Sequence, residues 1–64
     1  MKKMSVAAAR TDAEMTQKQA ALALGITPKT YCKYEKGHSM PSVEMAFKIA
    51  ALFGRSIDEI RFTK

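Results

Sequence analysis

Three lysines in the middle of the chain recur at the spacing of one helix face. Because each residue of an α-helix advances about 100° around the axis, Lys29, Lys33 and Lys36 share a face. Tyr31 and Tyr34 fall on the opposite face, where we expect them to pack into a core with their phenols at its rim. A short helix with one anchored face and one basic face has the shape and charge to enter the major groove of DNA. The pattern taken alone also fits lysines that are merely solvated.

Three other side chains could bind a ligand or react. Gln17 stands at the start of a predicted helix, where backbone amides and the helix dipole favour a phosphate. Cys32 is the single cysteine, which excludes an intrachain disulfide, and we expect no redox switch there. His38 is the single histidine and has no Cys, Asp or Glu grouped with it at ligand spacing, so no metal site is expected. For His38, contact with a phosphate and plain exposure both remain open.

The charge of the chain indicates the class of partner. The 64 residues carry a formal net charge of +5. Residues 15–42 hold four lysines against one glutamate, or +3, whereas residues 43–60 hold two basic and three acidic residues, or −1. This excess predicts an anionic partner, either nucleic acid or an acidic membrane surface. So small a core has no room for a substrate cavity, and the chain contains no recognisable catalytic set, so we expect neither an enzyme nor a cofactor.

Capping residues and glycines divide the chain into helices. Thr16 and Gln19 form the pattern of a capping box, and Thr27 precedes a proline at the first helical position. Gly25 and Gly37 each follow an apolar-periodic stretch, where a helix commonly ends. The predicted helices cover residues 4–13, 17–24, 28–36, 43–53 and 57–61. No segment alternates with period two, so no strand is expected, and the prediction is an all-α, compact bundle of five short helices in a single domain, 1–64.

The connection between the second and third predicted helices has a distinctive form. Leu24–Thr27 joins them with a turn of about three to four residues that contains a glycine. Such a turn is typical of a helix-turn-helix, in which two helices meet at a steep angle and the second is presented outward. The helix-turn-helix core therefore spans residues 16–37.

The order and spacing of residues over roughly positions 6–60 resemble those of a known family. The residues that carry the resemblance are Thr16-Gln17, Ala21, Gly25-Ile26-Thr27, Tyr31, Tyr34-Glu35-Lys36-Gly37, Pro41-Ser42 and Ile49-Ala50. They are similar to the Cro/phage-repressor type of helix-turn-helix, also called the xenobiotic-response-element family. The resemblance implies a lambda-repressor-like fold of five helices. It also implies sequence-specific binding to double-stranded DNA, commonly as a homodimer.

The same resemblance implies a set of DNA contacts centred on helix 28–36. They comprise phosphate contacts at the start of the second helix and after the third, and base contacts near the start of the third. The residues are Gln17, Thr27, Pro28, Lys29, Thr30, Lys33, Lys36 and His38.

Two further features follow from comparison with the family pattern. Arg10 and Glu35 occupy positions that commonly pair between the first and third helices. Pro28 stands where a polar base-reading residue is common, and it offers only apolar contact, such as to a thymine methyl group. Direct readout then depends on Lys29 and Lys33, and whether these read bases or only hold phosphates remains open.

These observations predict a DNA-binding transcriptional regulator, of the repressor kind. No apolar region follows the basic start of the chain, so we expect no signal peptide, no membrane association and a cytoplasmic location. We expect a homodimer through helix 57–61 and the tail Arg61-Phe62, with Phe62, beyond the core pattern, as the anchor. No small-molecule ligand is expected. The alternative is an antitoxin or another protein-interaction module on the same scaffold.

Overall fold

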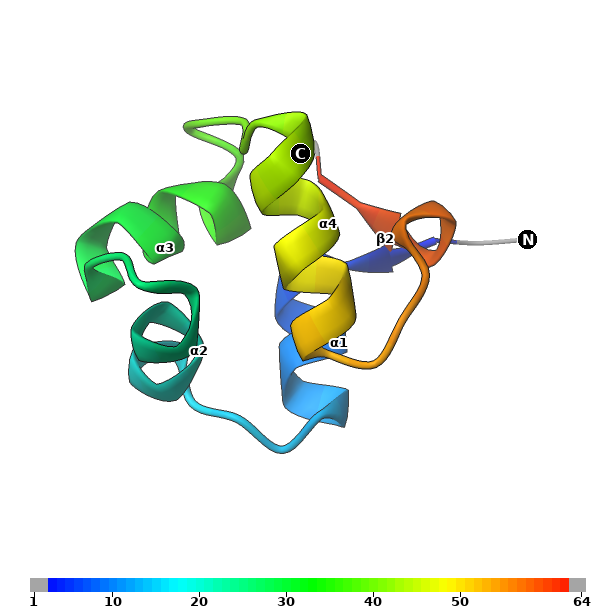
Figure 1. Cartoon of the computed structure of the whole chain (residues 1–64), viewed down its shortest axis with the longest axis horizontal. Helices are drawn as coiled ribbons and strands as arrows, with labels where there is room; N and C mark the ends of the chain where they lie inside the picture. The colour runs from blue at the N-terminus through cyan, green and yellow to red at the C-terminus, as the bar shows by residue number, and fades with distance from the viewer. Residues whose placement is uncertain (1–2, 63–64) are drawn as a thin grey trace.

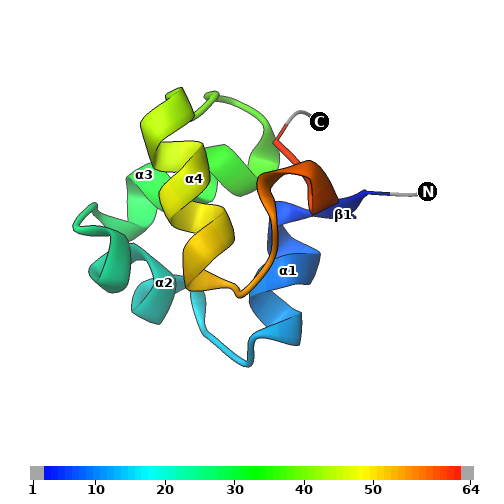
Figure 2. The same cartoon turned by 45° about the vertical axis from the view of Figure 1, so that its right-hand side comes forward.

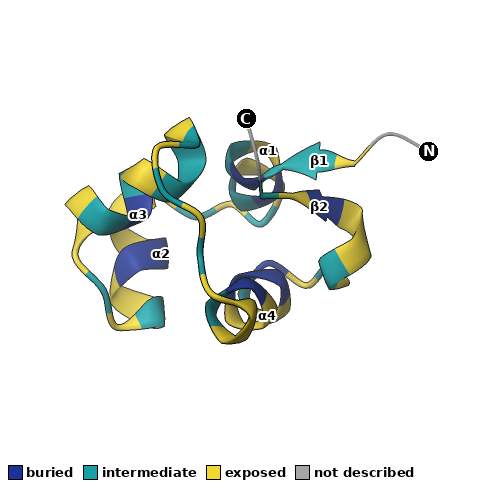
Figure 3. Cartoon of the chain, turned by 90° about the horizontal axis from the view of Figure 1, so that it is seen from above, coloured by how far each residue is buried: buried dark blue, intermediate teal, exposed yellow. Residues whose placement is uncertain are grey.

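The computed structural model describes residues 3–62. In chain order the elements are β1 (Met4–Ser5), α1 (Val6–Asp12), α2 (Gln17–Leu24), α3 (Pro28–Lys36), α4 (Val43–Leu52), the 3-10 helix η1 (Ile57–Glu59) and β2 (Ile60–Arg61). Helices α1 and α4 lie in the middle, with α2 and α3 on one side and the strand pair on the other (Figures 1 and 3). Among residues 3–62, no helix is long and apolar enough to cross a membrane.

Helices α2 and α3 begin at the capping residues that the sequence predicted. The Thr16 hydroxyl accepts a hydrogen bond from the Gln19 amide at 3.1 Å, and Gln19 Oε1 accepts one from the Thr16 amide at 2.9 Å. This capping box satisfies two amides that the first turn of α2 leaves without helical partners. Gly25 then ends α2 with a φ of +73°, a left-handed conformation that costs glycine little. The predicted boundaries of the second and third helices are confirmed.

The first helix is shorter than the predicted range of 4–13. The Ser5 hydroxyl accepts a hydrogen bond from the Ala8 amide at 3.0 Å, so Ser5 caps α1 and the helix begins at Val6. Met4 and Ser5 stay extended as β1. The alanine-rich pattern thus predicted the helix but not its start.

The prediction of a fifth helix over residues 57–61 is wrong. Only Ile57–Glu59 is helical, as a single 3-10 turn, and the next two residues form β2. This strand pairs in parallel with β1, with Met4 opposite Ile60, and the two strands lie side by side in Figure 3. Figure 2 shows β1 leading directly into α1. The expectation of no strand is therefore also wrong, because two-residue strands carry no alternation and their partners lie at opposite ends of the chain. The described residues contain four α-helices rather than five.

The core is built largely from small residues on α1 and α2 and larger ones on α3 and α4. Its buried members are Val6, Ala9, Ala20, Ala21, Tyr31, Ile49, Ala50, Phe53 and Ile60. Ala9 on α1 and Ala20 and Ala21 on α2 are fully buried, which allows these helices to pack closely against the larger side chains. The buried residues of α4 lie on one side of that helix. Figure 3 shows that this side faces α1 and that the exposed side of α4 is turned away.

The end of the described chain folds back onto this core. Phe62 is half-buried and packs against the core cluster, so the expectation that it lies beyond the core is wrong. The reason is the pairing of β1 with β2, which buries Ile60 and brings Phe62, directly after β2, against the core. Thr63 and Lys64 lie outside the described residues.

Candidate nucleic-acid interface

Helix α3 lies at the edge of the molecule, where α2 and α1 both support it (Figure 1). The turn Gly25–Thr27 connects it to α2, and the Thr27 hydroxyl caps it by accepting a hydrogen bond from the Thr30 amide at 3.2 Å. Pro28 occupies the first helical position, where its missing N–H removes no helical hydrogen bond. The cap and the proline therefore fix where α3 begins, and the short turn fixes its direction relative to α2.

The two faces of α3 are opposed as predicted. Lys29, Lys33 and Lys36 are all exposed, whereas Tyr31 on the other face is fully buried. Tyr34 is half-buried at the edge of the core, which confirms its place at the rim. The hydroxyl of Tyr31 departs from the prediction, because it lies inside the protein rather than at the rim. The buried ring anchors α3 so that the three lysines face solvent.

The first turn of α3 contains three of the predicted contact residues. The Thr27 hydroxyl donates to Thr30 Oγ1 at 2.9 Å and also accepts the capping bond, so its one hydrogen is already used. The Thr30 hydroxyl keeps its own hydrogen and is half-buried. Pro28 is exposed beside Lys29 and presents apolar surface.

The last predicted contacts follow one another at the far end of α3. Gly37 ends the helix with a φ of +76°, and the His38 amide donates to the Lys33 carbonyl at 3.0 Å. His38 and Lys36 are both exposed beside this helix end. Among residues 3–62, no three His, Cys, Asp or Glu side chains are grouped to hold a metal ion.

An ion pair joins α1 to α3, as the family pattern predicted. Arg10 Nε lies 2.7 Å from Glu35 Oε2, and both side chains are largely buried, with 18% and 7% exposed. Arg10 Nη1 also donates to the Met15 carbonyl at 2.8 Å, in the segment between α1 and α2. One guanidinium therefore ties α3 to the loop that leads into α2.

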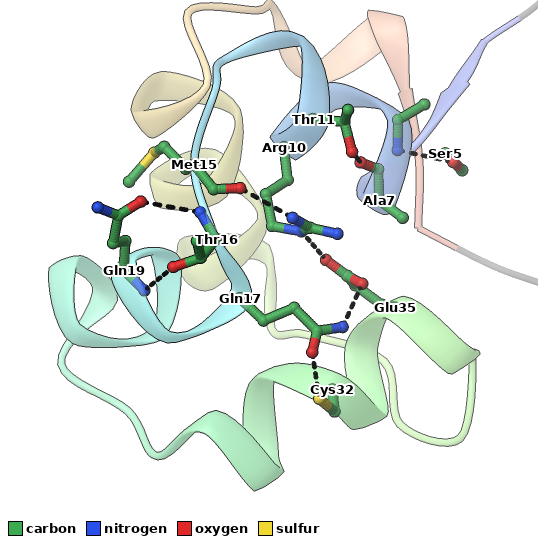
Figure 4. A network of polar contacts seen from close by, with 11 residues as sticks. Ser5, Ala7, Arg10, Thr11, Met15, Thr16, Gln17, Gln19, Cys32 and Glu35 are labelled. Atoms are coloured by element: carbon green, nitrogen blue, oxygen red, sulfur yellow. Dashed lines mark hydrogen bonds and ion pairs between the residues drawn. The ribbon is translucent and has the colours of Figure 1, made fainter.

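The pair belongs to a larger polar network that reaches α2 (Figure 4). Gln17 Nε2 donates to the other carboxylate oxygen of Glu35 at 2.9 Å. The Cys32 thiol donates to Gln17 Oε1 at 3.3 Å. Sequence reasoning placed Gln17 at a phosphate and missed both bonds, because these partners lie 18 and 15 residues away on another helix. Nothing in the local sequence pairs them.

Glu35 and Tyr31 influence each other's ionisation at the centre of this network. Burial raises the pKa of Glu35, but the polar groups of Tyr31, Gln17 and Arg10 outweigh burial and hold that pKa below its usual value. Burial raises the pKa of Tyr31, and the nearby carboxylate raises it further. The Tyr31 hydroxyl nevertheless forms no hydrogen bond of standard geometry with another described residue. At neutral pH the network thus holds a charged Glu35 beside a neutral phenol.

Comparison with known proteins agrees with this architecture. A helix-turn-helix family model matches residues 6–60. An uncharacterized HTH-type transcriptional regulator of Methanocaldococcus jannaschii is 44% identical over 46 residues, which cover 72% of this chain and 70% of the relative. A second such regulator, from Archaeoglobus fulgidus, is 37% identical over 51 residues, covering 80% of this chain and 72% of that protein.

A phage repressor is also similar to the chain. The cryptic phage CTXphi transcriptional repressor RstR of Vibrio cholerae is 33% identical over 51 residues, covering 80% of this chain. The match spans 46% of that repressor. No solved structure gives a significant match. The predicted resemblance is confirmed: the chain belongs to the Cro/phage-repressor type of helix-turn-helix family, and it is a DNA-binding transcription regulator.

Proposed function

We propose that this regulator reads its operator by placing α3 in the major groove of double-stranded DNA. The observation that carries the proposal is the opposition of the two faces of α3. Tyr31 is fully buried on one face, while Lys29, Lys33 and Lys36 are exposed on the other. An α-helix fits the major groove, and a helix anchored by a buried aromatic ring presents its opposite face rigidly.

The start of α3 supplies the base contacts in this proposal. Lysine donates hydrogen bonds to O6 and N7 of guanine, so Lys29 and Lys33 are the proposed readers of base edges. Pro28, exposed in the same turn, offers an apolar contact to a thymine methyl group. Thr30 has a hydroxyl hydrogen left to donate, whereas Thr27 contributes mainly by capping α3.

Phosphate contacts on both sides of α3 would fix its register on the duplex. Lys36 and His38 are exposed at the C-terminal end of α3 and are the proposed contacts there. Gln17 begins α2, where the helix dipole favours an anion. A primary amide carries two hydrogens on its nitrogen, so the bond to Glu35 leaves Gln17 one N–H for a phosphate oxygen.

The regulator is proposed to bind as a homodimer on a two-fold operator. Adjacent half-sites of such an operator lie about 34–36 Å apart along the DNA. The molecule is 31 × 23 × 19 Å, so two copies bound one helical turn apart are long enough to reach each other.

Selection of bound sequences from random duplex DNA tests the proposal directly. We expect enrichment of a two-fold related motif, with Lys29→Ala and Lys33→Ala each relaxing the preference at different base pairs. Lys48→Ala is the matched control, because Lys48 is exposed on α4, away from α3, and pairs with Glu44 at 3.6 Å. If no sequence is enriched, the proposed readout by α3 is wrong.

A further inference from the structure

The Gln17 side chain is unusual for an exposed glutamine because both ends of its amide are engaged by protein groups (Figure 4). Its nitrogen donates to the Glu35 carboxylate at 2.9 Å, and its oxygen accepts from the Cys32 thiol at 3.3 Å. Both partners lie on α3, whereas Gln17 is the first residue of α2. The two bonds therefore connect the start of α2 to the recognition helix.

The chemistry of the two partners favours one orientation of this amide. A carboxylate only accepts hydrogen bonds, so it requires the N–H end. A thiol is a weak donor, and as a donor it requires the oxygen end. If the amide were turned over, its oxygen would face the carboxylate, and its N–H group would have only the weakly accepting sulfur as a partner. Cys32 and Glu35 thus select the same orientation from opposite ends.

We propose that Cys32 is a positioning residue for DNA binding, which holds the Gln17 amide ready to donate to a phosphate. This inference rests on the proposed phosphate contact of Gln17. A phosphate oxygen accepts and never donates, so Gln17 must present N–H rather than C=O to it. A free glutamine side chain loses rotamer freedom when it binds, whereas one that Cys32 and Glu35 already hold loses little. Cys32 therefore strengthens DNA binding without touching the DNA.

The test compares Cys32→Ala, which removes the donor, with Cys32→Ser, which keeps one. Alanine is the best helix former, so the first variant does not weaken α3 itself. We expect Cys32→Ala to weaken binding about two- to tenfold, the factor that freezing one side chain implies. Cys32→Ser should bind as tightly as the unaltered chain. The ligands are a duplex selected from random DNA and an unrelated duplex of the same length.

Four readouts separate this role from a structural one. A phosphate contact carries no sequence information, so the loss should be equal on the two duplexes. Gln17 is neutral and releases no counterion, so the slope of log K against log salt should not change. In a Gln17→Ala background, the difference in affinity between Cys32→Ala and Cys32→Ser should disappear, because the two residues act through one contact. The free energy of unfolding in urea should be the same for Cys32→Ala and Cys32→Ser.

The mobility of the Gln17 side chain in the free protein can be measured independently of DNA binding. We expect NMR relaxation of its amide group to show greater motion in Cys32→Ala than in Cys32→Ser. Equal motion in both variants, or an effect of Cys32→Ala that persists without Gln17, overturns the role of Cys32. If neither Lys33→Ala nor Gln17→Ala weakens DNA binding, the proposed function itself is overturned instead.

Discussion

Lys29 and Lys33 lie on the exposed face of α3, and their side chains suit two different purposes. A lysine that bonds guanine discriminates between base pairs, whereas one that neutralises a phosphate strengthens binding to any sequence. The buried Tyr31 on the opposite face keeps both lysines directed outward. Substitution of each lysine distinguishes these two roles. Loss of a base contact weakens binding mainly to the operator, whereas loss of a phosphate contact weakens binding to any duplex.

We predict that Lys33→Ala weakens binding to the selected operator by about tenfold or more and binding to unrelated DNA by less. The reason is that one specific base contact contributes about 1–3 kcal/mol of discrimination. Fluorescence anisotropy titrations at one fixed salt concentration measure both affinities, with Lys48→Ala as the control. Equal loss on the two duplexes would assign Lys33 to a phosphate.

Glu35 joins three helices, since it lies on α3 and bonds Arg10 of α1 and Gln17 of α2. Its pKa is lower in the folded chain than its usual value, so it binds a proton less readily when folded. The stability it contributes is therefore fully present above the unfolded pKa of about 4.3 and is lost as pH falls through the lower folded value.

We predict that Glu35→Gln lowers the free energy of unfolding at pH 7 by about 1–3 kcal/mol, because it leaves the largely buried Arg10 without its charged partner. Between about pH 5 and pH 3, the unaltered chain should lose stability more steeply than this variant. Urea unfolding at each pH measures both effects. Glu44→Gln is the control, since Glu44 is 83% exposed and should change little. A parallel pH dependence in all three proteins would contradict the role of Glu35.

At the scale of elements, the turn between α2 and α3 sets the direction of the recognition helix. Gly25 adopts a φ of +73° there, and an added Cβ would meet no atom within 4 Å. Any cost of a side chain at this position therefore comes from the backbone conformation rather than from a clash. Substitution of Gly25 therefore tests the backbone conformation of the turn and not its packing.

We predict that Gly25→Ala destabilises the fold by about 1–2 kcal/mol, the usual cost of a left-handed backbone for a residue with a Cβ. Gly25→Asn should cost less, because asparagine tolerates this conformation better. Thermal or urea unfolding of the two variants measures the difference. If both variants are as stable as the unaltered chain, the turn must adopt another conformation in solution.

At the scale of the whole molecule, the net positive charge is concentrated on the segment that contains α2 and α3. Residues 15–42 carry +3 and residues 43–60 carry −1. A duplex bound at α3 therefore meets a basic part of the protein, and residues 43–60 add no attraction. Counterion release should then depend on lysines of α3 more than on those elsewhere.

We predict a slope of log K against log salt of roughly −3 to −5 per protomer, as expected for about three to five neutralised phosphates. Lys36→Ala should make this slope less steep by about one, whereas Lys48→Ala should leave it unchanged. Titrations across a series of salt concentrations give the slopes. A slope near zero for the unaltered chain would exclude this mode of binding.

The sequence by itself determined the helix-turn-helix. Thr16, Gly25, Thr27 and Gly37 set the ends of α2 and α3 through bonds to residues a few positions away, and such bonds form wherever the local pattern occurs. The opposed faces of α3 followed from helical periodicity in the same way. The pairing of Arg10 with Glu35 was predicted only through resemblance to a family, because nothing local joins two residues 25 positions apart.

The tertiary structure alone decided the remaining features. Gln17 meets Glu35 and Cys32 because α2 and α3 pack at one particular angle. Met4 pairs with Ile60 because the two ends of the described chain return to the same edge of the molecule. This pairing is why residues 60–61 form a strand rather than the predicted helix, and why the Phe62 side chain is partly buried. Such contacts depend on how every intervening element packs, and no short window of sequence contains that information.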